Sequence, residues 1–226
     1  AHDRNRAAAK CADIAALAPG HRLDIGMRRS LASYDGDLPA NLRTTEELLV
    51  AYPDDVNLRL SKASLLRRLA PHQDYLDYIR AQCNGPAAHA MLRLRLAQTL
   101  LEDARYRAEA IRILRRLVRG WCKPETLSSL GDAHWRAGEY PRAVELYRFA
   151  STLSEADEDH AQAYFRAARM VRGAETALAY LRQRIRRLGP LSAAPAMTLF
   201  ECIEELDRAT EAMTVLDEAL AAHPED

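Results

Sequence analysis

The feature that most constrains the fold of this chain is a sequence pattern that returns every 33 to 35 residues. From Ala143, a step of 34 residues reaches Ala177 and a further step of 35 reaches Ala212, while a step of 33 backwards reaches Ala110. A period of this length is the signature of repeat architectures, in which each repeat buries its apolar face by stacking on its neighbours.

The composition indicates that the repeated unit is helical. Residues of the AVILMFWYC class make up 48% of the chain, but aromatic residues make up only 6%, so alanine and leucine supply much of the apolar surface. Both are strong helix formers. Helices joined by turns at Pro53, Pro86, Pro124, Gly189-Pro190 and Pro224 are therefore expected, because proline ends one helix and starts the next. The predicted fold class is all-α.

One segment of the chain carries a specific motif. Its residues are Leu127, Leu130, Gly131, His134, Gly138-Glu139-Tyr140, Ala143, Tyr147 and Ala150. This spacing resembles the tetratricopeptide repeat, a helix-turn-helix unit of 34 residues. The resemblance implies a right-handed α-solenoid, or superhelix, of antiparallel helix pairs.

Applying this repeat to the whole chain gives six units. They cover residues 22–55, 56–90, 91–123, 124–157, 158–192 and 193–226 as one continuous solenoid, and the register of the third is ambiguous by one residue. Residues 1–21 fit either the second helix of a truncated preceding repeat or an N-terminal helix. We expect the chain to be a segment of a larger repeat protein.

Three repeats depart from the family pattern at its eighth position. The family prefers a small residue there, such as Gly131, because the paired helices approach closely, whereas the first, fifth and sixth repeats carry Arg29, Phe165 and Phe200. A bulky side chain at a close approach costs about 1–3 kcal/mol unless the helices move apart. We therefore expect altered curvature in repeats five and six.

Composition and motifs exclude several functions. The 32 basic and 32 acidic residues cancel, which removes the bulk electrostatic attraction to nucleic acid, so no nucleic-acid partner is expected. No apolar run reaches the length of a membrane span. Nucleophile elbows, phosphate-binding glycine loops and metal-binding motifs do not occur in the sequence. The predicted protein is not an enzyme and takes no cofactor or metal.

The four cysteines show neither a CxxC pair nor metal spacing. Unpaired thiols favour the cytoplasm, with the periplasm as the alternative. Cys122, beside Trp121, is predicted to fill a packing gap rather than to react.

His134 occupies a position that is packed in the family, and a structural role is expected for it. Arg112, Arg115, Arg116 and Arg119 share one helical face; such a stripe can follow a phosphate backbone, but a solvated outer face is expected.

The resemblance also implies where a ligand binds, because first helices in this family line the concave surface. The expected groove residues are Asn57, Arg67, Arg68, Arg95, Asp132, Trp135, Arg136, Arg166 and Arg169. Thr99 is expected to be exposed beside them. Acidic residues such as Glu205 are expected to line the C-terminal end of the groove. Guanidinium groups bind carboxylates bidentately, and a tryptophan is a typical binding anchor.

The leading hypothesis is a non-catalytic scaffold that binds another protein or an extended acidic peptide in this groove. The competing interpretation of the same residues is that the arginines pair with acidic neighbours inside the chain and that Trp135 packs into a repeat interface. Two alternatives place the solenoid in a larger system. One is the substrate-recognition arm of an enzyme such as a glycosyltransferase. The other is the periplasmic arm of an exopolysaccharide export protein, which recruits an enzyme or guides an anionic or polar polymer.

Overall fold

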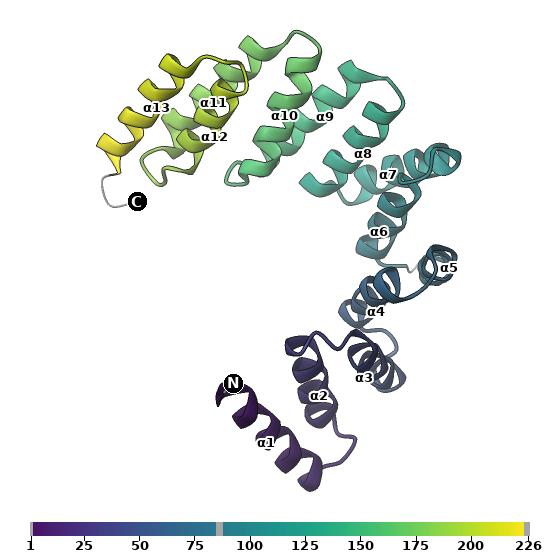
Figure 1. The fold of residues 1–226 in the computed structure, drawn as a ribbon. Coiled ribbons are helices and arrows are strands. Elements are labelled where there is room, and N and C mark those ends of the chain that lie inside the picture. The colour runs from purple at the N-terminus through teal and green to yellow at the C-terminus, as the bar shows by residue number, and fades with distance from the viewer. Residues whose placement is uncertain (1, 85–87, 224–226) are drawn as a thin grey trace. The chain divides into compact units, whose positions relative to one another are not determined.

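The computed structural model describes residues 2–84 and 88–223, and throughout those ranges the secondary structure is helical. The first helices in chain order are α1 (His2–Leu17), α2 (Arg22–Tyr34), α3 (Leu38–Ala51), α4 (Val56–Leu69), α5 (His72–Gln82) and α6 (Ala90–Leu100). After the short 3₁₀ helix η1 (Ala104–Tyr106) come α7 (Arg107–Gly120), α8 (Pro124–Arg136), α9 (Tyr140–Leu153), α10 (Glu158–Met170), α11 (Ala174–Leu188), α12 (Ala194–Glu204) and α13 (Ala209–Ala222). The all-α prediction is confirmed (Figure 1).

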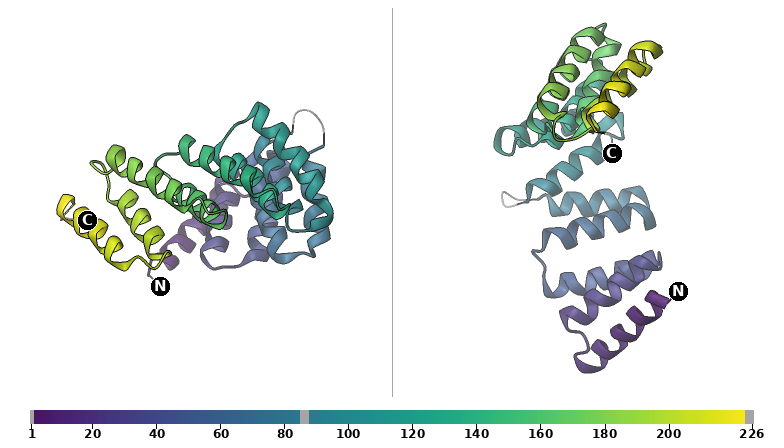
Figure 2. Two further views of the ribbon diagram at one scale, coloured as in Figure 1. Left: turned by 90° about the horizontal axis from the view of Figure 1, so that it is seen from above. Right: turned by 90° about the vertical axis from the view of Figure 1, so that its left-hand side faces the viewer.

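The chain divides into two compact units, residues 1–96 and 97–226. In the first unit α1 packs on α2, and the hairpins α2–α3 and α4–α5 follow one another. In the second unit α7 packs on α8, and the antiparallel hairpins α8–α9, α10–α11 and α12–α13 stack in sequence (Figure 2). This is the helix-hairpin solenoid architecture of tetratricopeptide repeats. The six repeat boundaries and their continuity stay predictions. Pro86 and Pro224, two of the predicted turn residues, lie outside the described residues.

Local sequence signals explain where the helices begin and turn. The carboxylates of Asp37, Asp55 and Asp157 each accept a hydrogen bond from a backbone N–H in the first turn of the next helix. The turns of the α2–α3 and α8–α9 hairpins use Gly36 and Gly138 at φ +71° and +78°, a conformation that glycine adopts without steric cost. The α10–α11 and α12–α13 turns place Arg172 and Asp207 in the same left-handed region.

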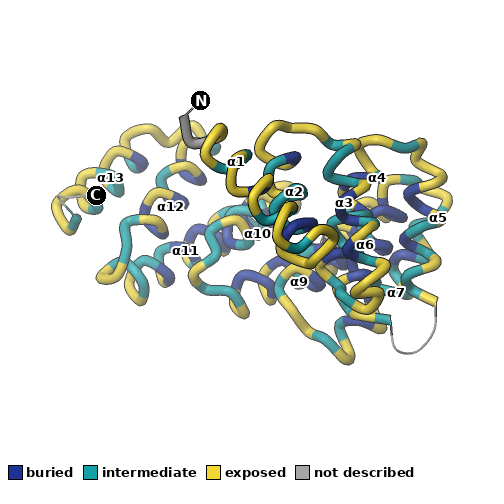
Figure 3. Tube along the Cα trace, turned by 90° about the horizontal axis from the view of Figure 1, so that it is seen from below, coloured by how far each residue is buried: buried dark blue, intermediate teal, exposed yellow. Residues whose placement is uncertain are grey.

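The buried residues lie on the helix faces that meet within a hairpin and between hairpins (Figure 3). In the second unit they form one core from α9 to α13, which includes Phe165 and Leu199. Gly131 lies against Tyr147, and a Cβ on it would approach the Tyr147 Cε1 atom to 3.0 Å. The close approach expected at Gly131 is confirmed. Phe165 is fully buried within the core, and the predicted change in curvature stays a prediction.

Candidate functional site

The first helices of the second unit present one polar surface, which we call the first-helix face: the exposed sides of α8, α10 and α12. Hydrogen bonds join these helices side by side. Ser128 Oγ and His160 Nδ1 lie 3.0 Å apart between α8 and α10, and Gln162 donates to Glu201 at 2.8 Å between α10 and α12. Because successive first helices are linked in this way, their exposed side chains form a continuous surface.

On α8 the structure brings together Asp132, Trp135 and Arg136. They are neighbours because residues three and four apart share a helix face. Trp135 is half-buried and meets Tyr140 edge-on, with 4.7 Å between the ring centroids. Asp132 is exposed and accepts a hydrogen bond of 2.6 Å from the Tyr147 hydroxyl. Burial, and then this carboxylate, raise the pKa of Tyr147. The tyrosine therefore stays a neutral hydrogen-bond donor.

Arg136 is exposed but anchored at one atom. Its Nη1 donates to the Leu101 carbonyl oxygen at 2.5 Å, which ties the end of α8 to the residue that follows α6. A guanidinium group has five N–H donors, so this bond leaves most of them available. Trp135 and Arg136 thus combine a rigid aromatic surface with an oriented cation.

Arg166 and Arg169, on α10, are paired within the chain. Arg166 Nε donates to Glu205 Oε1 at 2.9 Å, while Arg169 Nη1 lies 3.0 Å from Glu205 Oε2 and donates to the Glu205 backbone oxygen at 2.9 Å. The competing interpretation therefore holds for these two arginines, since Glu205, the residue that follows α12, already pairs with them. Trp135 likewise packs in part against the core of the second unit. Arg166 remains 55% exposed, so solvent and ligands still reach the pair.

The other four predicted residues belong to the first unit. Asn57, Arg67 and Arg68 lie on α4 and Arg95 lies on α6, and all four are exposed. Asn57 lines a polar hollow of about 640 Å³, together with Arg22 and Arg29 of α2. The nine predicted residues thus divide between two units.

Two expectations about exposure are wrong. Thr99 is 2% exposed, because it continues the buried side of α6 that Leu92 and Leu96 form. Gln98, one residue earlier, donates to Ser129 at 3.0 Å. Cys122 is exposed between α7 and α8 rather than filling a packing gap.

The residues considered for chemistry have structural surroundings. His134 is 4% exposed and its Nδ1 lies 2.9 Å from Glu139 Oε2, as expected for a packed residue. Hydrogen bonds from Arg142 and then His134 hold the pKa of Glu139 below its usual range. Burial raises the pKa of the Cys83 thiol to about 11 and that of Cys202 to about 12, so both thiols are protonated and poorly nucleophilic at neutral pH.

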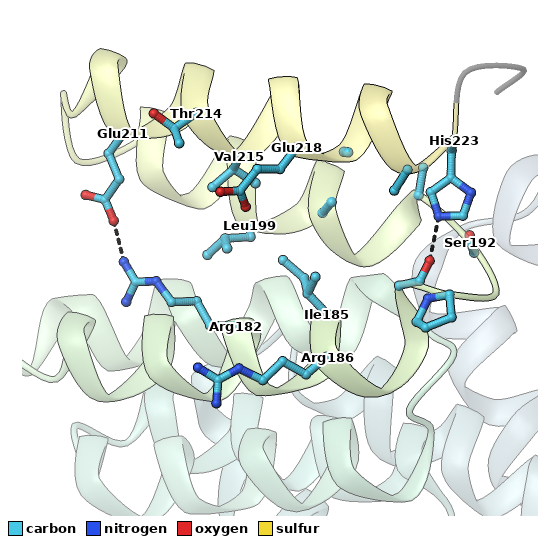
Figure 4. A pocket seen from close by; sticks show the side chains of 16 residues that line it. Arg182, Ile185, Arg186, Ser192, Leu199, Glu211, Thr214, Val215, Glu218 and His223 are labelled. Carbon is cyan, nitrogen blue, oxygen red and sulfur yellow. Dashed lines mark hydrogen bonds and ion pairs between the residues drawn. The ribbon is translucent and has the colours of Figure 1, made fainter.

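A larger apolar pocket, of about 710 Å³, lies between α11 and α13 (Figure 4). Ile185, Leu199 and Val215 line its floor. The ion pair between Arg182 and Glu211 closes one end, and His223 Nε2 closes the other by donating to the Gly189 carbonyl oxygen at 2.5 Å. Sequence reasoning missed this pocket, because it depends on the spacing of two helices that are 21 or more residues apart in the chain.

Arg184 of α11 was also missed. It is fully buried, and it forms a bidentate ion pair with Glu158 of α10 at 2.7 and 2.8 Å. It also donates to the Glu155 carbonyl oxygen at 2.5 Å. A signal was present, because Arg184 follows Ala177 and Leu181 at helical spacing and so belongs to the buried side of the helix. This pair supports the fold rather than a ligand.

The described ranges, residues 2–84 and 88–223, contain neither a membrane-spanning helix nor a metal-binding cluster. No helix there is long and apolar enough to cross a bilayer, and no group of three or more histidine, cysteine or acidic side chains is arranged to hold a metal ion.

Comparison with solved structures shows what the fold is similar to. PilW, titled a widely conserved type IV pilus biogenesis factor, matches with a TM-score of 0.60 and 13% identity over 91% of this chain and 96% of PilW. A tetratricopeptide repeat protein from Parabacteroides merdae matches with a TM-score of 0.58 and 11% identity over 98% and 94% of the two chains. A chain of the APC/C hetero-tetramer Cut9–Hcn1 matches with a TM-score of 0.59 and 14% identity over 99% of this chain. This protein spans 44% of that Cut9–Hcn1 chain.

The fold is therefore that of tetratricopeptide-repeat solenoids. Protein-family models give no match to the sequence, and neither do the curated proteins.

Proposed function

We propose that this protein is a non-catalytic scaffold that binds a partner protein, or an extended acidic peptide of one, on the first-helix face of its second unit. The fold supports the proposal: one structural neighbour is a subunit of a hetero-tetramer and another is a pilus biogenesis factor. The observation that carries it is the surface formed by Trp135 and Arg136. Tryptophan and arginine are among the residue types enriched at interaction hot spots, and here a half-buried tryptophan lies next to an exposed, oriented guanidinium.

The Arg166–Glu205 pair suggests how the surface selects acidic partners. The Glu205 carboxylate holds Arg166 and Arg169 in place, as a carboxylate from another chain would. A partner carboxylate that replaces Glu205 exchanges one ion pair for another, so the exchange costs little electrostatic energy. Specificity then comes from the aromatic contact at Trp135 and from hydrogen bonds along the face.

The experiment compares capture of a partner by the wild-type chain and by the double variant Trp135→Ala with Arg136→Glu. The expected result is loss of the partner with unchanged helicity in circular dichroism. A matched control changes two exposed residues on other helices, Arg6→Glu with Tyr34→Ala, and retains capture. Equal capture by the wild type and the double variant would move the binding site away from this face.

A further inference from the structure

The outer side of α7 carries four exposed arginines, Arg112, Arg115, Arg116 and Arg119, which we call the arginine ladder. Across the described ranges, none of the four makes a hydrogen bond, an ion pair or a ring contact. This differs from Arg166, Arg169 and Arg184 of the same unit, each of which has a carboxylate partner.

The ladder opposes the stability of the helix that carries it. Positions 112 and 116, and positions 115 and 119, are four residues apart, and like charges at that spacing repel each other. The dipole of α7 favours a cation at Arg119, in its last turn, but not at Arg112, which lies mid-helix. The chain uses arginine for 29 of its 32 basic residues, since only 3 are lysine. That preference explains which basic residue is present, but not why four of them share one side.

An apolar hollow of about 290 Å³ adjoins the ladder. Arg115 lines it together with Leu130 of α8 and with Leu146, Phe149 and Glu145 of α9. Phe149 is 62% exposed, which is unusual for a phenylalanine in a packed repeat. Cations and an unfilled apolar surface thus occur side by side.

We propose that the arginine ladder and this hollow form a second docking site, for an acidic peptide segment in extended conformation that carries a large apolar side chain. Side chains four apart on a helix are separated by about 6 Å, and alternate side chains of an extended chain by about 6.6 Å. Alternating carboxylates therefore match the ladder, and the apolar side chain fills the hollow against Phe149.

The hollow itself favours a peptide over other polyanions. Arg142 and Glu145 both line it, so their charges oppose each other there. The rest of its surface is mainly apolar, which suits a hydrocarbon side chain rather than a phosphate group. A membrane surface has no protruding side chain to fill a recess of this size, whereas a peptide can insert a single leucine or phenylalanine side chain. The proposed site uses no exposed residue of the first-helix face, so the proposal can be tested independently of the proposed function.

The test is a fluorescence anisotropy titration with a labelled synthetic peptide in which glutamate alternates with serine around one central leucine. Two variants probe the site: Arg112→Gln with Arg116→Gln, and Phe149→Ser. Arg6→Gln with Arg186→Gln is the control, because it removes two exposed, unpaired arginines elsewhere. Circular dichroism verifies that each variant keeps its helicity.

The proposal predicts that the ladder variant weakens binding on the order of tenfold, since each exposed charge pair contributes modestly. Phe149→Ser has a similar effect, and the control does not change the affinity. Replacing the central leucine of the peptide by serine weakens binding to the wild type but not to Phe149→Ser. Unchanged affinity in the ladder variant would overturn the proposal. Tighter binding of duplex DNA or of phosphatidylserine vesicles than of the peptide, abolished by the ladder variant, would overturn the peptide as the occupant.

Discussion

Glu158→Gln leaves the most deeply buried charge of the second unit without its counter-ion. The Arg184 side chain is 0% exposed, and its guanidinium group donates to both carboxylate oxygens of Glu158. The variant keeps the carbonyl oxygen of Glu155 as an acceptor, but a neutral amide replaces the carboxylate that binds the guanidinium. An uncompensated charge in a low-dielectric interior is strongly unfavourable.

The size of the effect follows from the geometry. Removing one partner of a buried ion pair typically costs about 3–5 kcal/mol. The Glu158 side chain is 23% exposed, so water compensates part of the loss, and glutamine retains one acceptor. We expect the free energy of unfolding of the second unit to fall by about 2–3 kcal/mol. Urea denaturation followed by circular dichroism at 222 nm measures it.

The double variant Glu158→Leu with Arg184→Met separates charge from packing. It removes both charges, so it should destabilise less than Glu158→Gln alone, as replacement of a buried pair by apolar residues is often neutral. Glu218→Gln is the control, because Glu218 is exposed on α13, and its midpoint should match the wild type. A Glu158→Gln midpoint equal to that of the wild type, or strictly additive effects in the double variant, would refute the reasoning.

Three further predictions concern packing, turns and pH. Gly131→Phe should lower stability by about 1–3 kcal/mol in urea denaturation, because a Cβ there already meets the Tyr147 ring at 3.0 Å; an unchanged midpoint would contradict the close approach. Gly138→Ala should cost about 1–2 kcal/mol by the same assay because φ is +78°, and a stability equal to that of wild type would show that the turn relaxes. Arg142 and His134 hold the pKa of Glu139 low, and Arg208 does the same for Glu175. Near the ordinary carboxyl pKa, about pH 4, the unfolded chain therefore binds more protons than the folded chain, and the thermal midpoint should fall as the pH drops through this range. A midpoint that rises as the pH drops would contradict the prediction.

The sequence predicted those parts of the fold that depend on local pattern. Gly131, Gly138 and Tyr147 occur at fixed offsets within one repeat, so the helix pair and its close contact could be read directly. The turn at Arg172 could not, because a positive φ at arginine is imposed by packing of the α10–α11 hairpin rather than by the residue's own preference.

The candidate site was only partly predictable, for a related reason. The resemblance to the tetratricopeptide repeat placed Asp132, Trp135 and Arg136 together on the inner side of a first helix. The partner of Arg166 is Glu205, 39 residues away, and that of Arg184 is Glu158, 26 residues away. Such pairs depend on how hairpins stack, and the division of the chain near residue 96 likewise depends on packing.

The most direct test of the account is the affinity of an acidic peptide for the wild-type chain and for Glu205→Gln, with Trp135 as reporter. Trp121→Phe makes Trp135 the only tryptophan, since the chain has 2. The account predicts a change in Trp135 fluorescence on binding and a Kd for Glu205→Gln that is roughly two- to fivefold lower, because Arg166 loses its competing internal carboxylate. An unchanged or higher Kd, or a peptide that binds with no response from Trp135, would contradict it.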